Sequence, residues 1–177
     1  MIDFPDVPLI ATITNDTFEL PCSGRTEQFR LAARVLVVDD KGCIPVLYTA
    51  LHGHHKIPGG GVEINENPSL AAIREAHEEA GAIIEINNVP IAKILEIKSD
   101  QNTKQLSLLF IGTLIEKNKS TDFTTDEIRE GYKGAVWMSV QGALELFSKD
   151  RPKTYMGKFM HARDFEFLKY AHKIGAI

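Results

Sequence analysis

Short apolar runs and apolar–polar alternation recur along the chain, and both patterns are typical of β-strands. They predict seven strands, at residues 8–13, 29–38, 43–50, 82–87, 90–98, 105–115 and 134–138. Turn-forming residues at 39–42 (DDKG) and 99–103 (SDQNT) separate neighbouring strands. We therefore expect two β-hairpins, one around each turn.

Apolar residues at helical spacing predict three helices, and the first spans residues 68–80. Asn67 is suited to cap its start, and Gly81 is suited to end it in the left-handed conformation. At about 100° per residue, its apolar side carries Leu70, Ile73, Ala76 and Ala80. Its acidic side carries Glu75, Glu78 and Glu79. We expect the apolar side to pack and the acidic side to face outward.

The other two helices follow the last strand. Ser139 is suited to cap a helix that ends near Ser148. Residues 159–174 carry apolar residues at helical spacing and predict the last helix. Strands and helices in this order predict an α+β fold, in which helices flank a mixed β-sheet.

The three glutamates of the first helix predict a divalent cation site. Carboxylates three and four residues apart on one helix repel each other, and a cation turns that repulsion into attraction. Ligands that are all oxygen suit Mg²⁺ or Mn²⁺, and these ions also bind substrate phosphates. The alternative is a solvated amphipathic helix in which Arg74 and Glu78 form an ordinary ion pair.

Residues 60–82, GGVEINENPSLAAIREAHEEAGA, join this helix to a glycine loop. Their pattern is G-x5-E-x7-R-E-U-x-E-E-x-G-U, where U is apolar. The fixed glycine and charged positions are Gly60, Glu66, Arg74, Glu75, Glu78, Glu79 and Gly81. This pattern resembles the Nudix box, the signature of hydrolases that cleave nucleoside diphosphates linked to another moiety.

The resemblance implies an α/β/α sandwich with a mixed sheet and a catalytic loop–helix–loop. It implies that Glu75, Glu78 and Glu79 bind metal, together with a backbone carbonyl of Gly59 or Gly60. It also implies that Glu66 and Arg74 form a structural brace between loop and helix. Which glutamate acts as general base stays open.

Some expected site residues lie outside the box. Relatives often recruit a later glutamate as metal ligand or base, and Glu127 is the first choice here and Glu130 the second. Arg34, Lys56 and Gly59 are candidate substrate-binding residues. For each charged residue the alternative is a solvent-exposed position. Residues 52–55 (HGHH) read as an exposed polar loop and not as a metal site.

Length and charge limit the remaining readings. A chain of 177 residues without a linker-like stretch fits one domain, in which residues 1–26 supply an extra strand or a dimer contact. A net charge of −4 argues against binding to a nucleic-acid polymer. Cys22 and Cys43 form no disulfide framework, and no segment reads as a signal peptide or membrane span. We expect a cytoplasmic protein, either a monomer or a homodimer.

The substrate must be inferred from residues outside the box. ADP-ribose-cleaving relatives tend to carry a proline about sixteen residues beyond it, where this chain reads Ile97-Lys98-Ser99. By elimination, the resemblance implies Mg²⁺-dependent hydrolysis of a nucleoside triphosphate, oxidised ones included, to monophosphate and pyrophosphate. ADP-ribose or another nucleotide sugar is the runner-up. A non-catalytic nucleotide-sensing or protein-binding module is the alternative of another class.

Overall fold

Two β-sheets form the framework of the computed structural model, which describes residues 4–21, 28–117, 121 and 123–177, with the backbone alone at 126 and 127. The larger sheet contains β1 (Leu9–Thr14), β2 (Gln28–Val38), β5 (Gly59–Gly61), β6 (Ala82–Ile86), β7 (Ala92–Lys98) and β8 (Thr103–Lys117). The smaller sheet contains β3 (Cys43–Thr49), β4 (His54–Lys56) and β9 (Tyr132–Ser139).

The larger sheet is mixed. Its strand order is β1-β7-β8-β2-β5, and β6 pairs with the far end of β8. The pairs β1/β7 and β2/β8 are parallel, whereas β2/β5, β6/β8 and β7/β8 are antiparallel. The long pairing of β2 with β8 makes these two strands the centre of the sheet.

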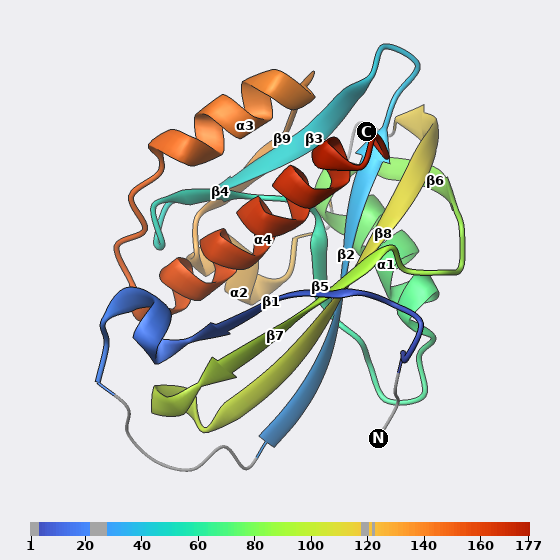
Figure 1. Cartoon of the computed structure of the whole chain (residues 1–177). Helices are drawn as coiled ribbons and strands as arrows, with labels where there is room; N and C mark the ends of the chain where they lie inside the picture. The colour runs from blue at the N-terminus through green and yellow to red at the C-terminus, as the bar shows by residue number, and fades with distance from the viewer. Residues whose placement is uncertain (1–3, 22–27, 118–120, 122) are drawn as a thin grey trace.

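Helices cover both faces of this sheet (Figure 1). On one face, α1 (Pro68–Ala80) packs against β2 and β6. On the other, α4 (Tyr155–Lys173) crosses β1 and β7 and also contacts β4, and α3 (Val140–Lys149) packs beside it. A short α2 (Thr125–Arg129) precedes β9, and 3₁₀ turns lie at η1 (Asn15–Phe18) and η2 (Ser99–Gln101). This is the expected α+β arrangement of a mixed sheet between helices.

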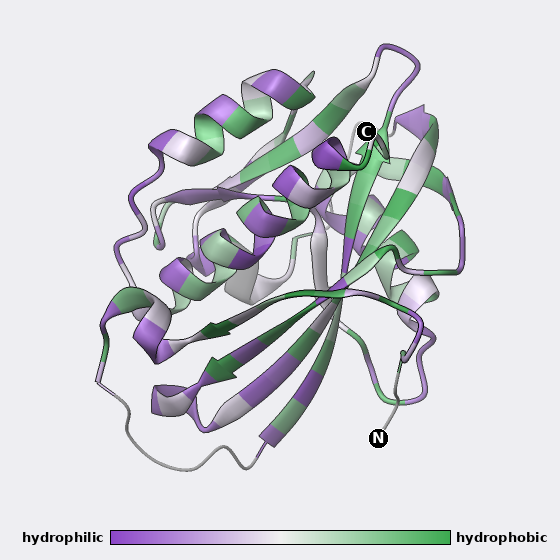
Figure 2. Ribbon diagram, viewed as in Figure 1, coloured by the Kyte–Doolittle hydropathy of each residue, from purple (hydrophilic) through white to green (hydrophobic). Residues whose placement is uncertain are grey.

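Two hydrophobic clusters fill the space on either side of β2. Val35 belongs to the cluster beneath α1, and its neighbour Leu36 belongs to the cluster beneath α4. Consecutive residues of a strand point to opposite faces, so a strand covered on both sides needs a continuous apolar run. Figure 2 shows that run in the upper half of β2 and β8, and a mixture of hydrophilic and hydrophobic residues towards η2. The larger sheet therefore changes from apolar to partly polar along the length of these strands.

The predicted elements are confirmed to within two residues at each strand end. The first helix spans residues 68–80, with the Asn67 side chain accepting a hydrogen bond from Ser69 N and Gly81 at φ 59°. The helix expected at 159–174 begins earlier, at Tyr155, because Thr154 caps it by accepting from Gly157 N. Two short strands, β4 and β5, and the helix α2 were not predicted.

One of the two predicted hairpins is wrong. Residues 39–42 do form a turn, with Gly42 at φ 72°, but β2 and β3 on either side of it belong to different sheets. β2 instead pairs with β8 along residues 28–38 and with β5 at residues 32–34, and β3 pairs with β4 and β9. The second hairpin, β7–β8, is confirmed. None of the described helices is long and apolar enough to span a membrane.

Candidate active site

The glycine loop runs along the edge of β2 as β5. Gly59 lies opposite Arg34 and Gly60 opposite Ala33. Gly59 has φ 146°, and a Cβ there would lie 2.3 Å from the Ala33 carbonyl oxygen, so only glycine fits. A Cβ on Gly60 would lie 2.1 Å from Oε1 of Glu75. The missing side chain of Gly60 therefore lets the carboxylate of Glu75 lie directly against the loop.

Arg74 connects this loop to three glutamates of the box. Its Nε and Nη2 donate to the two carboxylate oxygens of Glu66 at 2.9 and 3.1 Å, and Nη2 also donates to the carbonyl of Gly61 at 3.0 Å. Its Nη1 donates to Glu75 at 2.9 Å and Glu78 at 3.0 Å. These hydrogen bonds from Arg74 hold the pKa of Glu66 below its ordinary value. Glu66 and Arg74, expected to form a brace, are thus in bidentate contact.

Glu79 lies one helical turn beyond Glu75 on α1 and is only 1% exposed. One of its oxygens accepts from Lys56 Nζ, and the other accepts from Gly59 N at 2.8 Å. Lys56 Nζ lies 3.4 Å from the Gly59 carbonyl oxygen and 3.3 Å from the Tyr132 hydroxyl. Burial raises the pKa of Glu79 to about 7. Burial acts to lower the pKa of Lys56, but the nearby Glu79 carboxylate and Tyr132 hydroxyl together outweigh it and raise that pKa.

The acidic side of α1 does not face outward as predicted. Glu75 and Glu79 are buried, 6% and 1% exposed, because α1 packs this side against β5 and β9. Leu70, expected to pack, is 58% exposed instead. The carboxylates also separate into two groups, with Glu75 and Glu78 on Arg74 and Glu79 on Lys56.

The donor chemistry of this region fits a hard divalent cation. Among the described residues, no three His, Cys, Asp or Glu side chains are arranged around one metal position. However, the ammonium of Lys56 already lies against the Glu79 carboxylate and near the Gly59 carbonyl. A carboxylate and a glycine-loop carbonyl are the kinds of ligand that the resemblance assigned to Mg²⁺. The position between the Glu79 carboxylate and the Gly59 carbonyl therefore favours a positive charge.

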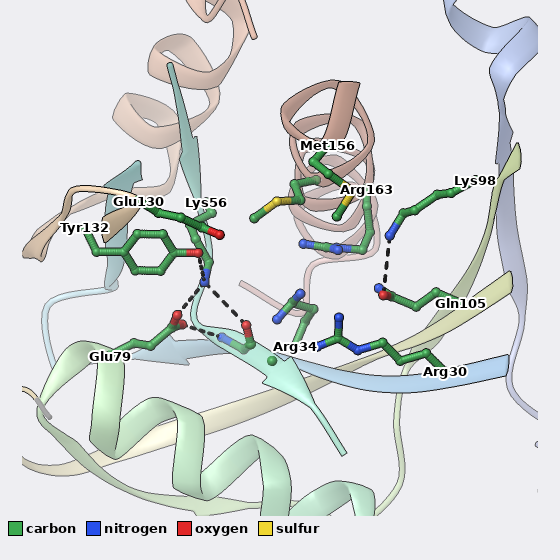
Figure 3. Close-up of a pocket in the computed structure, with 13 residues that line it drawn as sticks. Arg30, Arg34, Lys56, Glu79, Lys98, Gln105, Glu130, Tyr132, Met156 and Arg163 are labelled. Atoms are coloured by element: carbon green, nitrogen blue, oxygen red, sulfur yellow. Dashed lines mark hydrogen bonds and ion pairs between the residues drawn. The ribbon is translucent and has the colours of Figure 1, made fainter. Parts of the chain in front are cut away.

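A pocket of about 180 Å³ opens beside the loop (Figure 3). Of the predicted residues, Arg34, Lys56, Gly59, Gly60, Glu79 and Glu130 line it. Glu130 Oε2 lies 3.4 Å from His52 Nε2. Glu127 belongs to α2, but its side chain lies outside the described part of the chain.

Several lining residues were not predicted. They are Lys98, Gln105, Tyr132, Met156, Met160 and Arg163. Arg163 is 1% exposed and lies four residues from both Phe159 and Phe167, on the buried side of α4. A charge at an apolar-face position was the signal that could have revealed it.

The reading of residues 52–55 as an exposed loop is wrong. His52 is 7% exposed and His54 is fully buried, because His54 begins β4, which packs against α4, and His52 lies just before it. His52 Nδ1 lies 2.6 Å from the Thr154 hydroxyl. Burial lowers the pKa of His54 to about 4, so this ring is neutral at physiological pH.

Comparisons with known proteins identify the family and the fold. A family model described as NUDIX domain matches residues 28–158. Over 113 residues the chain is 29% identical to diphosphoinositol polyphosphate phosphohydrolase 2 of Mus musculus; the match covers 64% of this chain and 54% of that protein. The chain therefore spans about half the length of this curated relative.

Solved structures share the fold. A NUDIX hydrolase from Nitrosomonas europaea superposes with a TM-score of 0.57 at 16% identity, covering 77% of this chain and 89% of that one. A MutT protein from Methanosarcina mazei Go1 gives a TM-score of 0.56 at 18% identity, covering 83% and 97%.

Proposed function

Because the chain belongs to the Nudix family of hydrolases, we propose that it cleaves a phosphoanhydride bond in a compound that carries a diphosphate on another moiety. One observation carries this proposal. The box and the cationic pocket meet at Lys56, Gly59, Gly60 and Glu79, which line the pocket. Oxygen ligands for a divalent cation therefore lie next to side chains that attract phosphate.

Glu75, Glu78 and Glu79, with the backbone carbonyl of Gly60 or Gly59, are proposed to hold Mg²⁺, with Mn²⁺ as the alternative. When bound, the ion would neutralise phosphate charge and lower the pKa of a water molecule, so that the water can lose a proton and attack phosphorus. One of these glutamates, or Glu127, accepts the proton of that water. Arg74 positions Glu75 and Glu78 through its hydrogen bonds to both.

The lining favours a phosphate-rich substrate over one held by its base. Among the described lining residues the one aromatic ring is Tyr132, and the Lys56 ammonium lies over its face, 4.6 Å from the ring centre. Five lining side chains are cationic: Arg30, Arg34, Lys56, Lys98 and Arg163. We therefore propose a diphosphate on a multiply phosphorylated, non-aromatic moiety. The name of the mouse relative, which refers to diphosphoinositol polyphosphates, supports this class.

A nucleoside triphosphate, oxidised ones included, cleaved to monophosphate and pyrophosphate is the second candidate. Met156 and Met160 favour it, because flexible thioether side chains in the pocket wall can pack against a base. ADP-ribose and other nucleotide sugars complete the series of substrates to be compared.

The test is product release with Mg²⁺ from a diphosphoinositol polyphosphate, nucleoside triphosphates and ADP-ribose, followed by ³¹P NMR. Glu78→Gln should lower kcat/KM at least about 100-fold, because it removes one carboxylate charge from the proposed cation site. The matched control is Glu145→Gln on the exposed side of α3. Binding of these compounds without any turnover would support the non-catalytic module instead.

The oligomeric state is tested separately. β1 is the terminal strand of the larger sheet, and its outer edge could pair with a second copy. We propose a homodimer through residues 1–26 as the alternative to a monomer, and light scattering on the purified chain distinguishes the two.

A further inference from the structure

A second group of buried charges lies on the α4 side of the pocket, away from the box glutamates. Its cations are Arg34 on β2, Lys98 on β7 and Arg163 on α4, which are 6%, 1% and 1% exposed. Its carboxylates are Glu96 on β7 and Asp164 on α4, both fully buried. All three cations line the pocket.

The two carboxylates do not balance the three cations. Asp164 Oδ1 accepts from Arg163 Nε at 2.7 Å and lies 3.6 Å from Arg34 Nε. Glu96 lies 3.1 Å from Lys98 Nζ and accepts from Arg163 Nη1 at 3.4 Å. Within this group the three buried cations outnumber the two buried carboxylates by one, and buried charges usually lie close to an opposite charge.

Two guanidinium N–H groups of this cluster have no hydrogen-bond acceptor in the described part of the chain, Arg34 Nε and Arg163 Nη2. Leaving a buried charged donor without an acceptor is costly. Figure 3 shows the two side chains extending into the pocket from opposite walls, with Arg30 beside Arg34. Burial and the charge of Arg163 lower the pKa of Arg34, and the carboxylates of Asp164, Glu79 and Glu75 offset only part of that effect.

We propose that Arg34 and Arg163 form a subsite for a tetrahedral oxyanion, with Lys98 as its third cation. The pocket volume of about 180 Å³ is more than ten times the ~10–15 Å³ that a single water requires, which leaves room for a phosphoryl group. Resting on the proposed function, we assign this oxyanion to a phosphoryl group of the substrate; the free ion is the other source of the same chemistry. Arg163 thereby becomes a specificity-determining residue supplied by the C-terminal helix.

Binding of inorganic sulfate to the metal-free protein in EDTA tests the subsite without catalysis, because sulfate is tetrahedral and does not titrate near neutral pH. Isothermal titration should give an affinity that falls at least about tenfold in Arg163→Lys, which keeps the charge but loses the forked donor geometry. Arg151→Lys, the same change at an exposed position outside the pocket, is the matched control.

A measurement on the wild-type protein covers the case in which Arg163→Lys fails to fold. The ¹H–¹⁵N signal of Arg34 Nε, assigned with Arg34→Lys, should move on sulfate addition, while that of Arg151 stays in place. An unmoved Arg34 Nε signal, or equal sulfate affinity in Arg163→Lys and the wild type, would overturn the subsite.

Kinetics separate the two proposals. If the enzyme turns over a phosphate-rich substrate, Arg163→Lys should raise KM at least about tenfold and change kcat much less. Turnover with an unchanged KM in Arg163→Lys would refute the subsite and leave the hydrolase proposal intact. Sulfate binding that is lost in Arg163→Lys, without turnover of any compound, would refute the hydrolase proposal and retain the subsite for a free oxyanion.

Discussion

Replacing Lys56 by methionine tests whether this side chain is the counter-ion of Glu79. Methionine keeps most of the length of the lysine and removes the ammonium. Lys56 is 2% exposed and Glu79 is 1% exposed, so little water can reach the Glu79 carboxylate and solvate it once the ammonium is removed. The variant therefore leaves a buried carboxylate whose remaining described hydrogen bond comes from Gly59 N.

The loss can be bounded from this burial. Removing one partner of a buried ion pair typically costs about 3–5 kcal/mol. Glu79 limits the loss by taking up a proton, because burial already raises its pKa to about 7. We therefore expect the free energy of unfolding to fall by about 3 kcal/mol, at the lower end of that range.

Urea unfolding at pH 8 in EDTA, followed by circular dichroism, measures this loss without a divalent cation. The double variant Lys56→Met/Glu79→Gln should regain at least half of it, because it removes the charge that the single variant leaves unpaired. Lys149→Met, which breaks the exposed pair with Glu145 on α3, is the matched control and should unfold close to the wild type.

Two results would refute this reasoning. One is a loss in Lys56→Met that is no larger than the loss in Lys149→Met. The other is a double variant whose loss of unfolding free energy equals the sum of the losses in Lys56→Met and in Glu79→Gln. That result would mean that Lys56 and Glu79 do not interact.

Two further predictions concern the loop and its contact with α1. Gly60→Ala should lower kcat/KM at least about tenfold, because its Cβ would lie 2.1 Å from Glu75 Oε1 and force that carboxylate away; Gly134→Ala, with nothing within 4 Å, is the control. Glu66→Gln should lower the free energy of unfolding by about 1–2 kcal/mol at pH 7. Hydrogen bonds from Arg74 hold the pKa of Glu66 below the ordinary 4.5. The difference in unfolding free energy between the wild type and Glu66→Gln should therefore be complete above pH 4.5 and vanish as the pH falls through the lowered pKa. A difference that does not depend on pH in urea unfolding would contradict this prediction.

Local patterns were sufficient to place most elements in the sequence. Strands and helices leave period-2 and period-3.6 signals, and caps such as Asn67 and Gly81 mark their ends. The partner of a strand is decided by residues far away in the chain, so the pairing of β2 with β5 and β8, and not with β3, left no local signal. β5 consists of three glycines and has no side-chain pattern at all.

The fixed spacing of the box glutamates made it possible to find them in the sequence. Their environment in the fold could not be predicted in the same way. The helical wheel of α1 separates an acidic side from an apolar side, and it cannot tell which side meets the glycine loop. In the structure the loop covers Glu75 and Glu79, whereas the apolar Leu70 is exposed. Burial of the acidic side is what gives Glu79 a raised pKa and brings Lys56 to it.

The pocket residues left a signal that only several elements together reveal. On β7, Ala92, Ile94, Glu96 and Lys98 are all buried and share one face, which changes from apolar to charged along the strand. On β8, Leu109 and Ser107 share a face that continues to Gln105. On β2, Leu36 and Arg34 share the face that lies beneath α4. Each change alone reads as the solvent-exposed end of a strand.

These changes occur at the same end of the sheet, because the register pairs Gln105 of β8 with Arg30 on β2 and with Glu96 on β7. A strand end that is charged and also covered by a helix cannot be solvent-exposed, and α4 places Arg163 over this region. The polar end of the sheet is therefore a buried site, and its excess of cations points to an anionic ligand. In the function that we propose, the box supplies the oxygen ligands for a cation, and the opposite wall supplies the positive charge that a phosphate-rich substrate requires.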